Sequence, residues 1–204
     1  MQIAVPDLAD AGARLAENLG VASVEGGVHP GWGTGNRIVP LGDSYLELVS
    51  VIDPELAREN TFGRWVAANM IGRGRPLGWA VRTDDLDAIA ARLGLTPEPG
   101  SRETPDGRRL SWRTAGVGRA AEAPLLPFYI EWGEGTPFPG RADVGHLAGA
   151  LTIARLEVEG DPAALAAWLG EHSLPVAVRQ GDPAVRRIVL GAPAGEIVLD
   201  ATTL

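Results

Sequence analysis

The stretch Gly26–Val49, GGVHPGWGTGNRIVPLGDSYLELV, determines how the rest of this 204-residue chain is organised. Five of its first ten residues are glycine, and Pro30 removes a backbone N–H donor, so a helix is excluded here. The pattern predicts an irregular loop followed by a strand over Asn36–Leu41, a tight turn at Gly42-Asp43 and a second strand over Tyr45–Val51.

The first part of this stretch contains His29, Trp32 and Asn36, and its last strand carries the carboxylate of Glu47. Loops that hold such residues on a rigid sheet are where binding sites tend to lie. The alternative is a glycine-rich hairpin connection in which Trp32 only covers a sheet edge. The spacing by itself leaves both interpretations open.

The composition excludes several classes of chemistry. The chain is acidic, with a net charge of -8, and all 18 of its basic residues are arginine. Without lysine, Schiff-base chemistry and a lysine general base are excluded. The arginines form no basic stripe, so nucleic-acid binding is not expected. Without cysteine there is no disulfide, no thiolate metal site and no thiol nucleophile.

Nothing in the sequence indicates a membrane or export. No apolar run reaches the roughly 18 residues that a membrane-spanning helix needs. The first residues, MQIAVPDLADAG, have no basic region followed by an apolar core and do not predict a signal peptide. Together with the lack of cysteine, this favours a cytoplasmic protein.

Two segments follow the same order of elements. Gln2–Val5 reads as a strand, and Asp7 reads as the N-cap of a helix. Aligning VPDLADAGARL with RTDDLDAIAARL places Asp7 over Asp85, so this order is repeated. The sequence therefore predicts two βαβββ modules, at about 1–53 and 77–133, joined by a helical connector.

A third unit with the same order follows a linker after residue 133. It begins with a strand over Leu151–Glu159 and a helix capped by Asp161-Pro162, and ends with three further strands. We expect an α+β fold in which residues 1–140 form a domain of paired modules and residues 150–204 a third βαβββ-like unit packed on it. Each half-covered sheet needs a partner to bury its apolar face.

Four motifs stand in a fixed order along roughly the first two thirds of the chain. They are AVPDL at Ala4–Leu8, GG-x-HPGWGT-x-N at Gly26–Asn36, YLEL at Tyr45–Leu48 and LPF-x-IEW at Leu126–Trp132. In this order they resemble the glyoxalase-like domains of the vicinal oxygen chelate superfamily, of the glyoxalase/bleomycin-resistance type. The resemblance implies two modules whose curled mixed sheet forms a cup around a small-molecule site.

In many members of the superfamily a divalent metal lies in the cup, bound by one residue from each of four inner strands. Carried over residue by residue, these positions include Glu47 in the first module and Glu131 in the second. The first-strand histidine would lie just before Met1, and its counterpart maps near Gly78, which has no side chain. Two carboxylates without imidazole suit Mg²⁺ or Mn²⁺ better than Zn²⁺ or Fe²⁺.

The candidate catalytic residues are Glu47, Glu131 and His29. The resemblance implies an isomerase, lyase or dioxygenase acting on a small oxygen-containing substrate. In such an enzyme the carboxylates of Glu47 and Glu131 would approach one another and either bind a metal or act as acid and base. His29 would be a further metal ligand or base. The alternative is a metal-free protein that sequesters a hydrophobic or aromatic compound, as some superfamily members do with antibiotics.

The candidate ligand-binding residues are mostly aromatic, since aromatic walls are common in small-molecule sites, and include an arginine that could clamp a carboxylate or phosphate. They are Trp32, Asn36, Tyr45, Trp79, Trp112, Arg113 and Tyr129. The expected partner is a small-molecule ligand or substrate, with neither nucleic acid nor membrane. A homodimer is left open.

Overall fold

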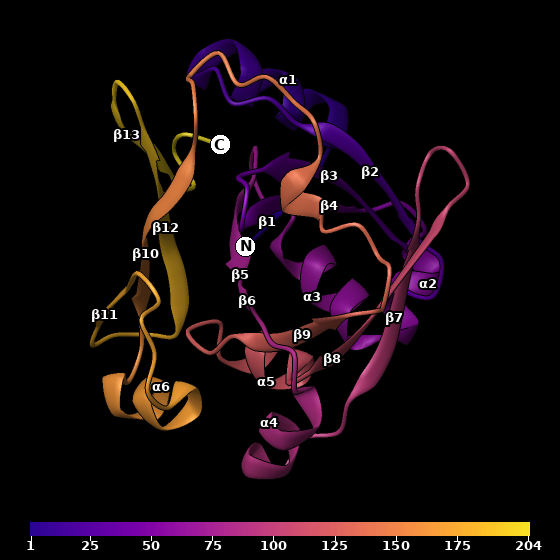
Figure 1. Ribbon diagram of the computed structural model, residues 1–204, viewed down its shortest axis with the longest axis vertical. Helices are drawn as coiled ribbons and strands as arrows, with labels where there is room; N and C mark the ends of the chain where they lie inside the picture. The colour runs from indigo at the N-terminus through magenta and orange to yellow at the C-terminus, as the bar shows by residue number, and fades with distance from the viewer.

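The computed structural model describes all residues, 1–204, and has a mixed α+β structure built on a curled sheet (Figure 1). The two modules have the predicted order of one strand, one helix and three strands. The first consists of β1 (Gln2–Ala4), α1 (Leu8–Leu19), β2 (Val24–His29), β3 (Thr34–Pro40) and β4 (Tyr45–Val51). The second consists of β6 (Ala80–Arg82), α4 (Leu86–Leu93), β7 (Glu98–Glu103), β8 (Arg109–Ala115) and β9 (Phe128–Trp132).

Nine strands form one sheet in the order β5-β1-β4-β3-β2-β7-β8-β9-β6. In each module the first strand pairs with the fourth in parallel, and the other neighbours are antiparallel. β5 (Arg75–Gly78) lies at one end of this order and β6 at the other, and only Trp79 separates them along the chain. The sheet is therefore nearly closed into a cup, and the modules meet at Val28 and Glu103.

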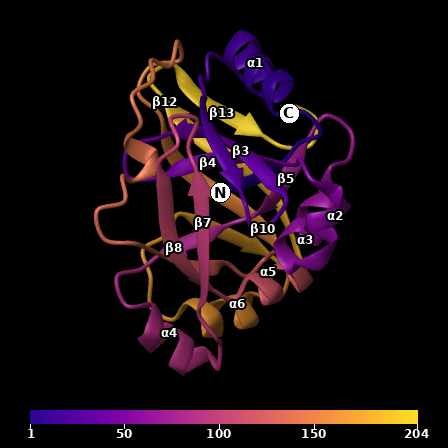
Figure 2. The same ribbon diagram turned by 90° about the vertical axis from the view of Figure 1, so that its right-hand side faces the viewer.

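The module helices begin and end at their sequence signals. The Asp7 side chain accepts a hydrogen bond from the backbone N–H of Asp10, and Gly20 ends α1 in the left-handed conformation. α4 repeats this arrangement with Asp85 and Gly94. A capping carboxylate satisfies a free N–H, and glycine adopts positive φ without a Cβ clash. The two helices lie at opposite ends of the molecule (Figure 2).

The structure differs from the sequence expectation in two places. The glycine-rich stretch is a β-hairpin, because β2 continues to His29 and β3 begins at Thr34. Gly33 in the turn has φ 66°, and an added Cβ would lie 2.5 Å from the backbone oxygen of Asp53, so only glycine fits. A short helix, α5 (Val117–Glu122), lies between β8 and β9, and the expected βαβββ order does not include it.

The connector between the modules folds as α2 (Pro54–Glu59) and α3 (Thr61–Asn69). Asp53 caps the first helix and Asn60 the second. The apolar face of α3 packs on inner-facing residues of the sheet and fills one side of the cup. This cluster consists of Ala4, Val49, Phe62, Trp65, Val66, Leu77, Ala120 and Phe128.

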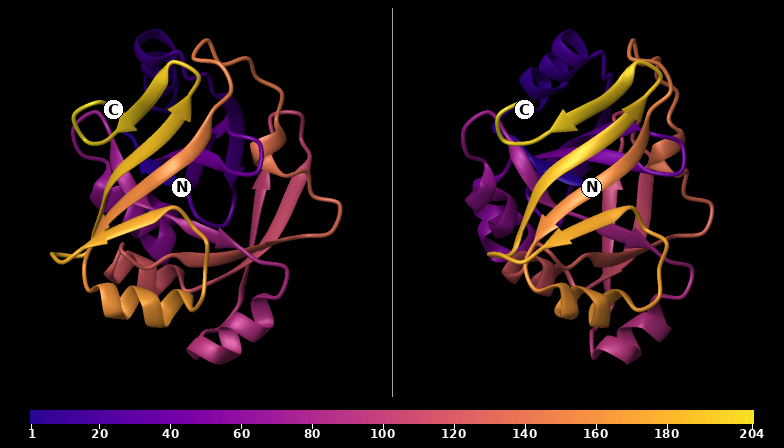
Figure 3. Two further views of the ribbon diagram at one scale, coloured as in Figure 1. Left: turned by 60° about the vertical axis from the view of Figure 1, so that its left-hand side comes forward. Right: turned by 90° about the vertical axis from the view of Figure 1, so that its left-hand side faces the viewer.

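Residues beyond 150 form a separate four-stranded sheet at one side of the cup (Figure 3). Its order of elements is the predicted one, but its strand order is β11-β10-β12-β13, so the first strand lies between the second and the third. In the modules the first strand lies beside the fourth. The bounds are β10 (Thr152–Glu159), α6 (Pro162–Leu169), β11 (Val176–Arg179), β12 (Ala184–Ala192) and β13 (Gly195–Leu199).

The small sheet and the outside of the cup share one apolar core. Leu46 and Leu48 of β4 belong to the same buried cluster as Leu156 of β10 and Ile188 of β12. The small sheet therefore covers the outer apolar face of the first module. Length and hydropathy together exclude every helix of this structure as a membrane span.

Candidate functional site

Alternation along the strands decides which side chains enter the cup. Leu46 and Leu48 face the core outside the cup, so Glu47 between them faces inwards. On β3, Asn36 lies opposite the inward-facing Val49 and therefore shares that face. All these inward groups are deeply buried, with Glu47 8% and Asn36 3% exposed.

The polar side chains inside the cup form one hydrogen-bonded chain. His29 Nδ1 lies 2.8 Å from Thr34 Oγ1, and His29 Nε2 lies 3.3 Å from Asn36 Nδ2. Asn36 Nδ2 also donates to Glu47 Oε1 at 2.5 Å, and His29 Nε2 lies 3.7 Å from that same oxygen. The chain holds Oε1 of Glu47 in place, while Oε2 makes no hydrogen bond in the structure.

Burial sets the protonation of two groups beside Glu47. It lowers the pKa of His29 to about 4, while Glu47 raises this pKa to a smaller extent and Arg102 lowers it further. The imidazole is therefore neutral near pH 7, with Nε2 as acceptor and Nδ1–H as donor in the chain above. Burial, reinforced by Glu47, also raises the pKa of Tyr45, so its phenol stays protonated.

Aromatic rings surround the polar chain. The His29 ring centroid lies 5.4 Å from that of Trp32 and 5.9 Å from that of Trp112, and Trp112 lies 5.3 Å from Trp132. The rings enclose a cavity of about 30 Å³, room for about one water molecule. It is lined by Gln2, Trp32, Tyr45, Glu47, Phe62, Trp112, Thr114, Val117, Phe128, Ile130 and Trp132.

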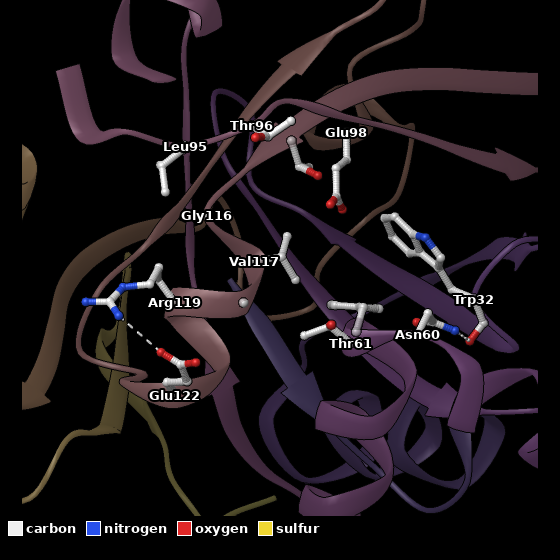
Figure 4. A pocket seen from close by; sticks show the side chains of 13 residues that line it. Trp32, Asn60, Thr61, Leu95, Thr96, Glu98, Gly116, Val117, Arg119 and Glu122 are labelled. Atoms are coloured by element: carbon white, nitrogen blue, oxygen red, sulfur yellow. Dashed lines mark hydrogen bonds and ion pairs between the residues drawn. The ribbon is translucent and has the colours of Figure 1, made fainter. Parts of the chain in front are cut away.

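Two larger cavities share walls with this inner cavity. One of about 330 Å³ lies beside α3 and α5, with the Arg119–Glu122 ion pair across it from Trp32 (Figure 4). It shares Trp32, Phe62, Thr114 and Val117 with the inner cavity. The other, of about 500 Å³, lies between the cup and the small sheet and is mostly apolar. It shares Tyr45, Ile130 and Trp132 with the inner cavity.

Glu131 does not lie in the cup. Its neighbours on β9, Ile130 and Trp132, line the inner cavity, so Glu131 faces outwards. There it forms an ion pair with Arg113 at 2.6 Å and accepts a hydrogen bond from the backbone N–H of Leu86 at the start of α4. The expected approach of Glu131 to Glu47 therefore does not occur.

The register of the strand pairs explains why Glu131 is not the structural counterpart of Glu47. The parallel pairing of β1 with β4 places Gln2 opposite Glu47. The module alignment sets Ala80 over Gln2, and the pairing of β6 with β9 places Ala80 opposite Phe128. The structural counterpart of Glu47 in the second module is therefore Phe128, an apolar residue.

Three of the expected ligand-binding residues belong neither to the polar chain nor to the wall of the inner cavity. Arg113 bridges two carboxylates on the outer face, and the Tyr129 hydroxyl donates to a backbone oxygen of α6. Trp79 is buried in the shared core and lines only the cavity beside the small sheet. The residues that the structure does bring together are His29, Trp32, Asn36, Tyr45, Glu47 and Trp112.

The residues of the cup do not fit the divalent metal that the resemblance implies. No three His, Asp or Glu side chains come together to hold an ion. The two carboxylates that were expected to bind Mg²⁺ or Mn²⁺, Glu47 and Glu131, lie on opposite faces of the sheet. At Gly78 an added Cβ would lie 2.3 Å from the indole of Trp65, which fills the place of a ligand side chain. The buried guanidinium of Arg102 adds positive charge beside Glu47, which disfavours a further cation.

Sequence reasoning missed Arg102 and Thr34. Arg102 is 6% exposed and donates from Nη1 to Asn36 Oδ1 at 3.2 Å. Its strand reads EPGSRE and has no apolar residue to indicate the buried face, so no sequence signal pointed to it. Thr34 lies within the HPGWGT motif, but its contact with His29 depends on the hairpin register.

Comparison with known proteins places this geometry in a family. The model of the family described as a glyoxalase-like domain matches residues 1–173. The fold is similar to that of a hypothetical protein from Staphylococcus aureus, with TM-score 0.57 and 13% identity over 88% of this chain and 77% of that chain. Two structures of Streptomyces coelicolor methylmalonyl-CoA epimerase variants, each in complex with 2-nitronate-propionyl-CoA, give TM-score 0.44 and 20% identity over 68% of this chain and 94% of those chains.

A search of curated proteins found no match. The family match nevertheless covers residues 1–173 of 204, which is most of the chain, and includes both modules of the cup. The chain belongs to the glyoxalase-like domain family.

Proposed function

We propose that the protein is a small-molecule enzyme of the isomerase or lyase type in which Glu47 takes a proton from a carbon next to a carbonyl group. The observation that carries this proposal is the chain from His29 through Asn36 to Glu47. It holds one carboxylate oxygen in place and leaves the other without a hydrogen bond, at the wall of an aromatic cavity. A positioned carboxylate in a site with little water is a suitable general base.

The proton transfer balances with this chain's own groups. Glu47 Oε2 accepts the proton, and the electron pair of the broken C–H bond moves to the carbonyl oxygen of the substrate. In this proposal the protonated phenol of Tyr45, which lines the same cavity as Glu47, donates a hydrogen bond to that developing oxyanion. Return of the proton to a different carbon that is conjugated with the enolate gives an isomerase, and departure of a leaving group from the carbon next to the deprotonated one gives a lyase. The dioxygenase alternative needs a redox metal, and the side chains in the cup do not fit one.

The test is hydrogen–deuterium exchange at an acidic C–H bond. The parent protein in D₂O is mixed with phenylpyruvate, which is anionic, and separately with phenylacetone, which is neutral, and loss of the methylene proton signal is followed by NMR. We expect exchange above the buffer rate with at least one compound, and about a 100-fold loss of that enhancement in Glu47→Gln. Glu131→Gln is the matched control, because that carboxylate faces away from the cup.

A second candidate function is sequestration of an apolar or aromatic compound. The rings of Trp32, Trp112 and Trp132 around the inner cavity favour it. This function predicts quenching of tryptophan fluorescence by both compounds without proton exchange, and equal quenching in Glu47→Gln. Binding without exchange would therefore refute the enzyme and support sequestration.

A further inference from the structure

Arg102 is a buried cation that makes no direct contact with a carboxylate, although Glu47 lies close enough to interact with its charge. It projects from β7 into the cup, is 6% exposed, and forms no salt bridge in the structure. Its one hydrogen bond runs from Nη1 to Asn36 Oδ1, and its Nε is buried with no partner. Buried arginines are normally paired with a carboxylate or phosphate, so this donor lacks the group it is suited to bind.

The chain around Arg102 is shaped to admit the guanidinium. At Gly26 an added Cβ would lie 2.7 Å from Arg102 Nη1 and 2.0 Å from Asn36 Oδ1. Any other residue there would displace one of the two groups. Asn36 then connects the guanidinium to Glu47, since its oxygen accepts from Arg102 and its nitrogen donates to Glu47. A group bound at Arg102 is thus one side chain away from the proposed base.

Arg102 also lines a cavity of about 720 Å³ on the side of the cup beneath residues 136–142. Two other arginines line this cavity, and both already have acidic partners, Arg108 with Asp106 and Arg141 with Asp43. Apolar residues supply part of the wall, which suits an organic body rather than a free inorganic ion. These are Val24, Ile38, Leu110, Phe138 and Ala142.

We infer that Arg102 binds the oxyanion, carboxylate or phosphate, of an organic ligand that enters through this cavity, so the substrate of Glu47 is an acid. Charge-assisted hydrogen bonds from a guanidinium hold such groups in a fixed orientation. The inference rests on the proposed function in one respect only, namely that the acid bound by Arg102 is the substrate of Glu47. Anion binding by Arg102 can be measured without any reaction.

The test compares matched charged and neutral probes by quenching of tryptophan fluorescence. Phenylacetate is compared with the isosteric amide phenylacetamide, and phenyl phosphate forms a second arm that separates a carboxylate preference from a phosphate preference. We expect the parent to bind at least one anion about tenfold or more tightly than the amide, as one charge-assisted hydrogen bond suffices for this. Arg102→Gln is expected to bring the ratio of anion affinity to amide affinity close to one.

Arg109→Gln is the control, because Arg109 lies on neighbouring β8, is exposed, and donates to Ser101 instead of lining the cavity. It should keep the parent's ratio. If Arg102→Gln does not fold by circular dichroism, Arg102→Lys replaces it and should keep a preference for anions that is weaker than the parent's. A parent that binds neither anion better than the amide, or an Arg102 variant that keeps the full ratio, overturns the inference.

Glu47→Gln separates this inference from the proposed function. It should lose proton exchange but keep the anion preference. Exchange that depends on Glu47 in a protein without anion preference would overturn the role of Arg102 alone. An anion preference in a protein without exchange would overturn the proposed enzyme alone.

Discussion

Mild acid is expected to destabilise this protein through His29. The imidazole is 2% exposed, and burial lowers its pKa from 6.5 to about 4. Between these values the unfolded chain binds a proton that the folded protein excludes, so the free energy of unfolding falls as the pH falls. The contribution of neutral His29 is fully present above about pH 6.5 and is lost as the pH approaches 4.

The magnitude follows from the two pKa values. Their difference of about 2.5 corresponds to about 3.4 kcal/mol in the acid limit, at 1.36 kcal/mol for each pKa unit. Between pH 7 and pH 5 the same values give a loss of about 2 kcal/mol, because the folded imidazole is still mostly neutral at pH 5. A loss of this size is easily measured against a typical stability of about 5–15 kcal/mol.

The assay is urea unfolding, followed by tryptophan fluorescence, of the parent and of His29→Gln at pH 7 and pH 5. Glutamine is neutral at both pH values and keeps a donor and an acceptor, so the parent-minus-variant difference isolates the histidine. We expect the free energy of unfolding of the parent, relative to that of His29→Gln, to fall by about 2 kcal/mol between pH 7 and pH 5. His172→Gln, at an exposed histidine, should behave like the parent. A difference that is constant within about 0.5 kcal/mol would refute the buried neutral imidazole.

Two further substitutions test the placement of the site. Gly26→Ala is expected to lower the free energy of unfolding by about 1–3 kcal/mol, because its Cβ would overlap Asn36 and Arg102. Gly31→Ala is the control, since nothing lies within 4 Å of the added carbon, and its free energy of unfolding in urea should be close to the parent's. Glu131→Gln is expected to lose at most about 1 kcal/mol, since its partner Arg113 is 42% exposed, and to leave probe quenching unchanged. A large loss of probe binding in Glu131→Gln would return this carboxylate to the site.

Local sequence signals were sufficient for most of the fold. The capping residues Asp7 and Asp85 marked both module helices, since capping depends only on neighbouring backbone groups. In the same way, YLELVSV alternates polar and apolar residues at its start, and this local alternation puts Glu47 on the face opposite Leu46 and Leu48. The motif order along the chain was enough to indicate the family, and the match over residues 1–173 confirms it.

The composition of the site depended on contacts between distant strands. Alternation along FYIEW puts Phe128, Ile130 and Trp132 on one face and Tyr129 and Glu131 on the other, but the strand's own sequence does not show which face lines the inner cavity. That choice is made by the register of β9 against β6, in which a shift of one residue exchanges the two faces. Arg102 likewise lies on a strand without apolar alternation, and only the closure of β7 onto β2 brings it to Asn36, 66 positions away in the chain. The sequence by itself determined the elements and the family, because those depend on short-range patterns. The tertiary structure decided which charged groups meet, because pairing register and sheet closure are properties of strands far apart in sequence.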